Sequence, residues 1–206
     1  MKELNLYKIR DFALNSRRRV YSIIELSKLI NKPYNITKVY ANRLVSEGLA
    51  TKIIQGKIAF TENNLIIGTQ LLEPSYISYH FSLNFYGCIR QIPFKMILIT
   101  TQRPRKISEY TYKHIIPDLF FGYNREKYDD AYIFIAQPEK AILDMIYFDR
   151  APYELFDDIL NKLNQVKLKK YINKYKKIKN NRAKLVVKFG EYYDRQKRVR
   201  PNIKIK

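Results

Sequence analysis

The sequence is poor in the residues that build disulfide frameworks, zinc sites and phosphate-binding loops. It has one cysteine, Cys88, and two histidines, His80 and His114. A single cysteine excludes an intrachain disulfide framework, and the set is too small for a Cys/His zinc site. The six glycines form neither a G-x-G nor a G-x-x-x-x-G-K pattern. We therefore expect a reducing compartment, no metal and no cofactor.

Long apolar runs are also missing from the sequence. No stretch approaches the roughly eighteen consecutive apolar residues that indicate a membrane span. The opening residues MKELN lack the apolar centre of a signal peptide. We therefore expect a cytoplasmic protein with no membrane partner.

Acidic residues are scarce relative to basic ones. The 206 residues include 39 Lys and Arg against 19 Asp and Glu, which gives a formal net charge of +20. A surface of this charge attracts polyanions, which favours nucleic acid as the partner. The length allows one or two domains with a substantial core.

The acidic residues form no recognisable catalytic motif. Pro117-Asp118 could begin a nuclease motif, but no Asp/Glu-x-Lys follows on an apolar strand at a suitable distance. A lone histidine between two aromatic residues, as His80 is, is more often structural than a general base. We therefore expect no catalytic residue and no enzyme; a nucleic-acid enzyme of the nuclease type is the alternative.

Residues 20–60 have the pattern of two short helices followed by a β-hairpin. Ser22 and Glu25 have the spacing of a capping box, which predicts that a helix begins there. Proline ends this helix at residues 31–33, and a second helix is predicted from an N-cap at Asn35 to the glycine Gly48. Two β-prone runs, 50–54 and 57–60, then flank a Gln-Gly turn. The order predicts a winged helix-turn-helix.

The second predicted helix supplies the candidate base contacts. Its larger apolar residues, among them Ile36 and Val39, recur on one side at helical spacing. The opposite side is small and polar, which suits an element in the major groove, where lysine can meet guanine and asparagine can pair with adenine. We expect contacts with base edges from Thr37, Lys38, Ala41 and Asn42.

Several cations near this segment predict contacts with the DNA backbone. Lys52 and Lys57 flank the hairpin turn, and Arg17, Arg18 and Arg19 precede the first of the two helices. Two alternatives remain open, because a charge run at a helix end can simply be solvated and a wing can contact a protein.

The remaining sequence predicts an α+β domain and a basic helical end. Within residues 63–152 we expect a small mixed or antiparallel sheet, with strands over 95–101, 110–115, 119–123 and 131–136 and a helix that opens at Pro138. Residues 153–206 are predicted to be helical and to pack on this domain. The predicted fold class is α+β, and the predicted segments are 1–62, 63–152 and 153–206.

Positive charge is concentrated at the end of the chain. Residues 166–206 contain sixteen Lys or Arg and two acidic residues, a balance of +14. Leu168, Ile172 and Tyr175 keep a helical stripe, which predicts a folded basic helix. We expect a second phosphate-contacting surface, with a merely solvated face as the alternative, and its candidate residues are Lys167, Lys170, Lys174 and Lys177.

Three motifs after the predicted winged unit carry a resemblance to a known family. Tyr76-Ile77-Ser78 is followed by the run SLNFYG over residues 82–87 and by AQPEKAILD over residues 136–144. In this order, the motifs resemble the AbiEi antitoxins of type IV toxin-antitoxin systems, over about residues 20–150.

The resemblance implies a transcriptional regulator that represses its own operon through the winged domain. It also implies that the following domain counteracts a toxin of nucleotidyltransferase fold, without necessarily forming a stable complex. The expected partners are therefore double-stranded DNA from the protein's own promoter, bound as a monomer or homodimer, and such a toxin. A stand-alone regulator and an antitoxin that acts by direct protein binding are the alternatives.

Overall fold

The computed structural model describes residues 5–91, 95–107 and 109–199. The predicted segments 1–62 and 153–206 therefore extend at their outer ends beyond the described residues. The chain divides into two compact units, Met1–Ser75 with Arg125–Phe134, and Tyr76–Asn124 with Ile135–Lys206. Residues 125–134 thus join the first unit although they lie in the middle of the second predicted segment. Helices and sheets are mixed in the chain, which has the α+β character that the sequence predicts.

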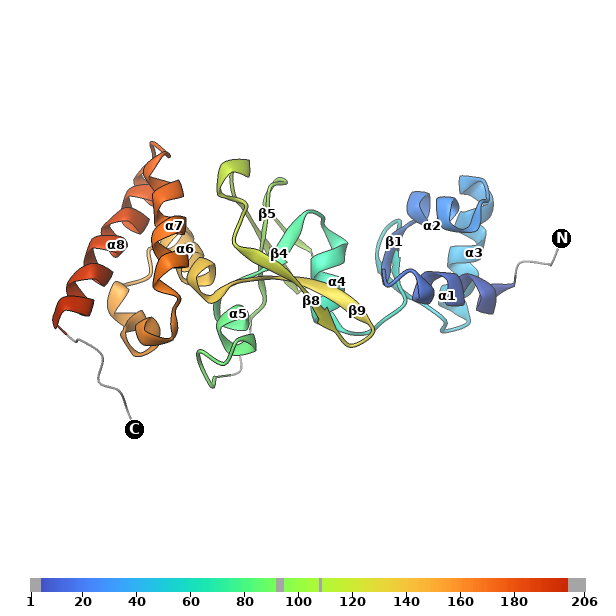
Figure 1. Cartoon of the computed structure of the whole chain (residues 1–206). Helices are drawn as coiled ribbons and strands as arrows, with labels where there is room; N and C mark the ends of the chain where they lie inside the picture. Colours follow the sequence, from blue (N-terminus) through green and yellow to red (C-terminus); the bar gives the residue numbers. More distant parts are fainter. Residues whose placement is uncertain (1–4, 92–94, 108, 200–206) are drawn as a thin grey trace. The chain divides into compact units, whose positions relative to one another are not determined.

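In the described part of the first unit, helices accompany a three-stranded antiparallel sheet of order β1-β3-β2. Figure 1 shows α1, α2 and α3 beside β1 of this sheet. The sequence predicts the two strands of the hairpin; the third, β1, pairs with β3 from Val20 opposite Ala59. The elements in chain order are α1 (Leu6–Asn15), β1 (Val20–Ser22), α2 (Ile23–Ile30), α3 (Tyr34–Ser46), β2 (Thr51–Ile54), β3 (Lys57–Ala59) and α4 (Asn64–Leu71).

Local capping signals determine where α2 begins and ends. The Ser22 hydroxyl accepts a hydrogen bond from the Glu25 amide at 3.2 Å, and the Glu25 carboxylate accepts one from the Ser22 amide at 2.7 Å. Both bonds of the predicted capping box are therefore present, which confirms it. Asn31 ends the helix in the left-handed conformation, with φ of 51°.

The start of α3 differs from the prediction, whereas its end agrees. Pro33 occupies the N-cap position, so the helix begins at Tyr34 and the predicted N-cap at Asn35 is wrong. Proline is well tolerated here because the first amides of a helix have no intrahelical acceptor. Gly48 follows the helix with φ of 67°, which confirms the predicted glycine stop.

An apolar core joins the first three helices to the three-stranded sheet. Ile9 of α1, Leu26 of α2 and Leu44 of α3 are completely buried in it. Tyr21 of β1 packs edge to face against Phe60, with ring centroids 5.8 Å apart. Burying each large aliphatic side chain contributes about 2 kcal/mol, so this core fixes α3 against the hairpin.

The second sheet has six strands in the order β6-β7-β5-β4-β9-β8. The pairs β4–β9 and β5–β7 are parallel and β6–β7 is antiparallel, so the sheet is mixed. The strand predicted over 119–123 is wrong: a 3₁₀ turn, η1 (Pro117–Leu119), precedes a strand that starts at Tyr123. The strands are β4 (Ser75–Ile77), β5 (Ile97–Thr100), β6 (Arg105–Ile107), β7 (Tyr110–His114), β8 (Tyr123–Tyr128) and β9 (Ala131–Ala136).

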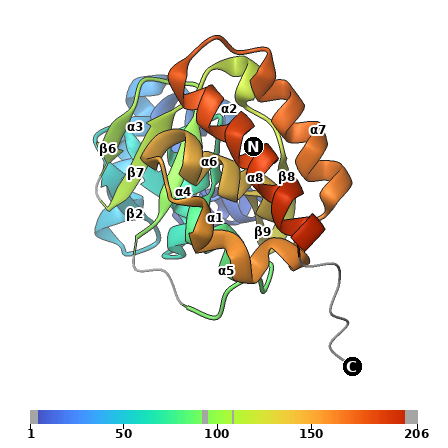
Figure 2. The same ribbon diagram turned by 90° about the vertical axis from the view of Figure 1, so that its left-hand side faces the viewer.

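The helices of the second unit gather around α6, whose residues 139–147 are all buried. Both α7 and α8 pack on α6 and on each other (Figure 2). The helical elements are α5 (Tyr79–Phe85), α6 (Pro138–Asp149), the 3₁₀ segment η2 (Tyr153–Lys162), α7 (Gln165–Lys176) and α8 (Asn181–Val199). Over the ranges that the structure describes, every helix is too short or too polar to cross a membrane.

Candidate nucleic-acid interface

A groove of about 490 Å³ lies between α3 and the hairpin formed by β2 and β3. One wall is a face of the helix, and the other is the hairpin with its turn. The polar residues that line it are Lys38, Asn42 and Ser46 from α3, and Lys52, Gln55 and Lys57 from the hairpin. The structure therefore brings together the helix and the hairpin that the sequence predicts to act together.

Lys38 and Asn42 lie one helical turn apart on α3, and both side chains are exposed. Residues four apart on a helix are neighbours on its surface, so the ammonium and the amide are presented side by side. An ammonium offers three hydrogen-bond donors, and an amide offers both donors and an acceptor. The two side chains can therefore form hydrogen bonds with neighbouring donor and acceptor groups on a partner's surface.

Two of the four predicted base contacts are wrong, because their side chains are buried. Thr37 has no exposed surface, and its hydroxyl donates to the Pro33 carbonyl oxygen at 3.0 Å. Ala41 is only 2% exposed. Small side chains at these positions let the backbone of α3 approach its neighbours closely. Ile36 and Val39, two of the larger apolar residues on the opposite predicted side, are about half exposed.

The exposed face of α3 also includes Tyr34, which lines the groove and is half exposed. Tyr34 is not among the contact residues predicted from the sequence. Thr37, Ala41 and Leu44 are the buried residues of α3, and Tyr34, Lys38 and Asn42 stay exposed where the helix lines the groove. Thr37, Ala41 and Leu44 are spaced four and three residues apart, which is typical of a buried helix face. The larger aliphatic residues elsewhere on the helix favoured a different face in the prediction.

The two hairpin lysines have different environments. Lys52 on β2 is exposed, as a phosphate contact requires. Lys57 on β3 is half-buried, and its ammonium donates to the Leu71 carbonyl oxygen at 2.6 Å. Lys57 also lines the groove, and a contact with phosphate would compete with its bond to the neutral Leu71 carbonyl, so its contact with DNA stays a prediction.

The three consecutive arginines do not form one cationic surface. Arg17 is exposed and donates to the Tyr132 hydroxyl at 2.7 Å. Arg18 is paired with Glu25 at 2.9 Å and with Glu73 at 2.8 Å. The two carboxylates balance its charge, which leaves Arg18 a poor candidate for phosphate binding.

Arg19 is buried, so its predicted contact with the DNA backbone is wrong. Its side chain is 3% exposed and pairs with Asp130 at 2.8 Å. The guanidinium also donates to the carbonyl oxygens of Leu14 at 2.8 Å and Asp130 at 3.1 Å. These bonds replace the hydration that a buried cation loses. Only Arg17 of the three stays available at the surface.

The four lysines predicted to form a second basic surface are all exposed on α7 or at its C-cap. Leu168, Ile172 and Tyr175 are buried on the other side, which confirms the predicted apolar stripe. Lys174 lies 4.1 Å from the ring centroid of Phe121. Aromatic contact stabilises a cation without neutralising it, so this helix face keeps its positive charge.

A metal-dependent nuclease holds its metal ion with side chains such as His, Asp and Glu. Among the residues that the structure describes, no group of three His, Cys, Asp or Glu residues is arranged to hold a metal ion. Burial raises the pKa of the Cys88 thiol, which disfavours the reactive thiolate.

Comparison with protein-family models and with curated proteins finds no match for this chain.

Proposed function

We propose that the first unit is a winged helix-turn-helix and that the protein is a cytoplasmic, sequence-specific DNA-binding repressor. In this proposal α2 and α3 form the helix-turn-helix, α3 is the recognition helix, and the hairpin of β2 and β3 is the wing. The observation that carries the proposal is the exposed pair Lys38 and Asn42 beside a groove that Lys52 also lines. The formal charge of +20 supports a polyanionic partner.

The exposed side chains fit separate roles in DNA recognition. The Asn42 amide can pair with adenine at N6 and N7, and the Lys38 ammonium can donate to O6 or N7 of guanine. Lys52 and Arg17 would donate to phosphate oxygens, which orients the unit without reading sequence. Repression would follow because a bound protein excludes transcription from its own promoter.

Binding of the full chain to two duplexes tests this function. One duplex comes from just upstream of the gene and the other is a scrambled duplex of equal length, each titrated by fluorescence anisotropy at two salt concentrations. We expect a preference of at least about a hundredfold that persists at the higher salt, since base readout depends less on counterion release. Equal affinities that both collapse with salt would contradict the proposal.

A matched pair of variants tests the role of α3. Asn42→Ala should weaken binding to the promoter duplex by about tenfold or more and leave binding to the scrambled duplex nearly unchanged. Asn15→Ala removes an exposed amide at the end of α1 and serves as the control. Equal losses on both duplexes for Asn42→Ala would reject α3 as the recognition helix.

The resemblance to AbiEi proteins extends the proposal to an antitoxin role for the second unit. Co-expression with a neighbouring nucleotidyltransferase-like toxin should restore growth, and the double variant Lys38→Ala/Asn42→Ala should restore it equally. Failure of the unaltered chain to restore growth would reject the antitoxin role. Co-purification of the two proteins would favour direct binding, and metal-dependent cleavage of DNA would favour the nuclease alternative.

A further inference from the structure

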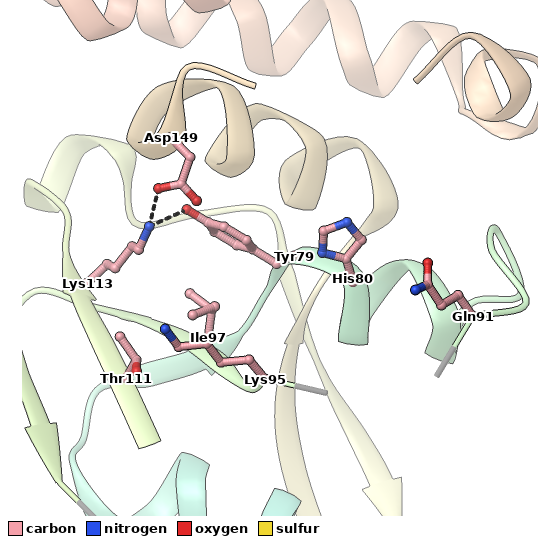
Figure 3. A pocket seen from close by; sticks show the side chains of 8 residues that line it. All are labelled: Tyr79, His80, Gln91, Lys95, Ile97, Thr111, Lys113 and Asp149. Carbon is pink, nitrogen blue, oxygen red and sulfur yellow. Dashed lines mark hydrogen bonds and ion pairs between the residues drawn. The ribbon is translucent and has the colours of Figure 1, made fainter. Parts of the chain in front are cut away.

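The second unit contains a pocket of about 480 Å³ that the proposed DNA contacts do not use. Its walls come from the start of α5, the beginning of β5, one face of β7 and the end of α6 (Figure 3). Ile97 of β5 and Thr111 of β7 are opposite each other in the parallel register of these strands. The sheet therefore provides a rigid wall, which is typical of a preformed ligand pocket.

Lys113 is held in place on one side of this pocket. Its ammonium donates to the Tyr79 hydroxyl at 2.9 Å and to the Asp149 carboxylate. It also lies 5.0 Å from the ring centroid of Tyr79 and 5.5 Å from that of Phe148. An ammonium has three donors, and among the described residues two acceptors are in place. A third donor remains for a ligand, on a side chain that is already ordered.

Tyr79 has a strained backbone at the edge of the same pocket. Its φ is 63°, in the left-handed region that a bulky residue rarely adopts, although the side chain is only 5% exposed. Its hydroxyl is fixed between Lys113 and Asp149. Strain of this kind persists only where the surroundings hold it, and it is concentrated at functional sites. The left-handed backbone of Tyr79 places its ring and hydroxyl beside Lys113, whose ammonium they position.

Lys95, Thr111, His80 and Gln91 also line the pocket, and each of them can donate a hydrogen bond. Lys95 is exposed, and Figure 3 shows its end and that of Lys113 on the same side of the pocket as Thr111. The Asp149 charge is balanced by Lys113, so Lys95 leaves the lining with a net positive charge. The Lys95 ammonium, the remaining donor of Lys113 and the Thr111 hydroxyl can each donate to an oxygen of a phosphate group.

We propose that this pocket binds a small phosphomonoester of about nucleotide size, with Lys95, Lys113 and Thr111 donating to the phosphate. A phosphate ion alone would leave most of the 480 Å³ empty, so there is space for an organic group against Ile97. His80 and Gln91 lie at the other end of the pocket, where they can contact that group (Figure 3). The site is independent of α3 and of the hairpin.

Calorimetric titration of the full chain with AMP, adenosine and inorganic phosphate tests this site. We expect AMP to bind in a one-to-one complex, inorganic phosphate to compete with it, and adenosine to bind at least about tenfold more weakly. Lys95→Ala should weaken AMP binding by about tenfold, and Thr111→Val should also weaken it while keeping the fold. Lys127→Ala removes an exposed lysine of the first unit and is the matched control.

Three results would overturn the proposal. These are no AMP binding at millimolar concentration, equal affinity for AMP and adenosine, and equal losses for Lys95→Ala and Lys127→Ala. The double variant Lys38→Ala/Asn42→Ala should keep full AMP affinity, because its changes lie in the other unit. AMP binding can therefore fail while DNA binding succeeds, and the reverse, so the two proposals are tested separately.

Discussion

Lys140 and Asp144 lie one turn apart on α6 and form an ion pair in which both side chains are fully buried. The hydroxyls of Tyr76 and Ser78 donate to the Asp144 carboxylate at 3.1 and 2.8 Å, and the ammonium of Lys140 donates to the Tyr175 hydroxyl at 2.9 Å. Burial lowers the pKa of Lys140 and raises the pKa of Asp144, while their mutual attraction opposes both shifts. The pair thus links β4, α6 and α7.

Removing one partner of this pair should destabilise the protein more than replacing both. Asp144→Ala leaves an unpaired buried ammonium, so we expect a loss of about 3–5 kcal/mol in the free energy of unfolding. The double variant Lys140→Met/Asp144→Leu removes both charges and should lose less stability than Asp144→Ala alone. Urea unfolding measures these values, with the exposed Asp158→Ala as the control. A loss below about 1 kcal/mol for Asp144→Ala would contradict the argument.

The same substitution at Arg17 and at Arg19 should affect different properties: DNA binding at Arg17 and stability at Arg19. Arg19→Met leaves the carbonyl oxygens of Leu14 and Asp130 without their donor, so we expect about 2–4 kcal/mol lower stability. Arg17→Met removes an exposed cation and should change stability by less than about 1 kcal/mol while weakening binding to all DNA. Thermal unfolding and anisotropy together separate the two roles. Similar stabilities for both variants would reject this distinction.

Features set by neighbouring residues were predictable from the sequence. The capping box of Ser22 and Glu25 depends on residues three apart, and the stop at Gly48 depends on the conformational freedom of a single glycine. The hairpin follows from two β-prone runs and the Gly56 turn. In each case the stabilising interaction lies within a few residues, so the local pattern contains it.

Features set by distant partners were not predictable. Arg19 is buried because Asp130, 111 positions later in the chain, meets its guanidinium. Lys57 is occupied by the carbonyl of Leu71, in an element for which the hairpin pattern gives no signal. The face of α3 was assigned wrongly because packing favoured the small Thr37 and Ala41 over larger aliphatic residues. All three features depend on tertiary contacts that the neighbouring sequence does not contain.

Glu25 should make the stability of the first unit depend on pH in the acid range. Partial burial raises the pKa of its carboxyl, but hydrogen bonds from Ser22 and the charge of Arg18 outweigh this, so the net pKa lies below the ordinary value of 4.5. The stabilisation is therefore complete above pH 4.5 and is lost as the pH falls through the lower pKa of the folded state. Glu25→Gln should lower stability by about 0.5–1 kcal/mol at pH 7.

The difference between the Glu25→Gln variant and the unaltered chain should shrink as the pH is lowered below 4.5. Unfolding curves at several pH values measure it, and Glu62→Gln, at an exposed position, is the control. A difference that stays constant down to about pH 3 would show that shape, not charge, accounts for the effect.

Lys52 and Lys57 should separate DNA binding from stability within one hairpin. Lys52→Ala should weaken binding to promoter and scrambled duplexes alike and reduce the slope of log affinity against log salt by about one. Lys57→Ala removes the bond to the Leu71 carbonyl and should instead lower stability by about 1 kcal/mol. Salt titrations and urea unfolding of both variants check this, with Lys127→Ala as the control. An unchanged salt slope for Lys52→Ala would exclude it as a phosphate contact.

Gly122 and Gly56 share a backbone conformation but differ in their surroundings. Their φ values are 74° and 78°, so alanine at either position has the same left-handed strain of about 1 kcal/mol. At Gly122 a methyl group would lie 3.0 Å from Tyr171 and 3.1 Å from the Cβ of Lys140, whereas at Gly56 no described atom lies within 4 Å. Gly122→Ala adds overpacking and should lose about 2–4 kcal/mol in total, against about 1 kcal/mol for Gly56→Ala.

The difference between these two alanine variants measures the contacts of a methyl group at position 122 with Tyr171 and Lys140, since the backbone strain cancels. A displaced Lys140 would also weaken its buried pairing with Asp144, so the loss at Gly122 should shrink in the background Lys140→Met/Asp144→Leu. Urea unfolding of the two glycine variants, alone and in that background, measures the coupling. Equal losses at both glycines would mean that α6 and α7 yield to the methyl group, and that the packing around Lys140 is looser than the distances indicate.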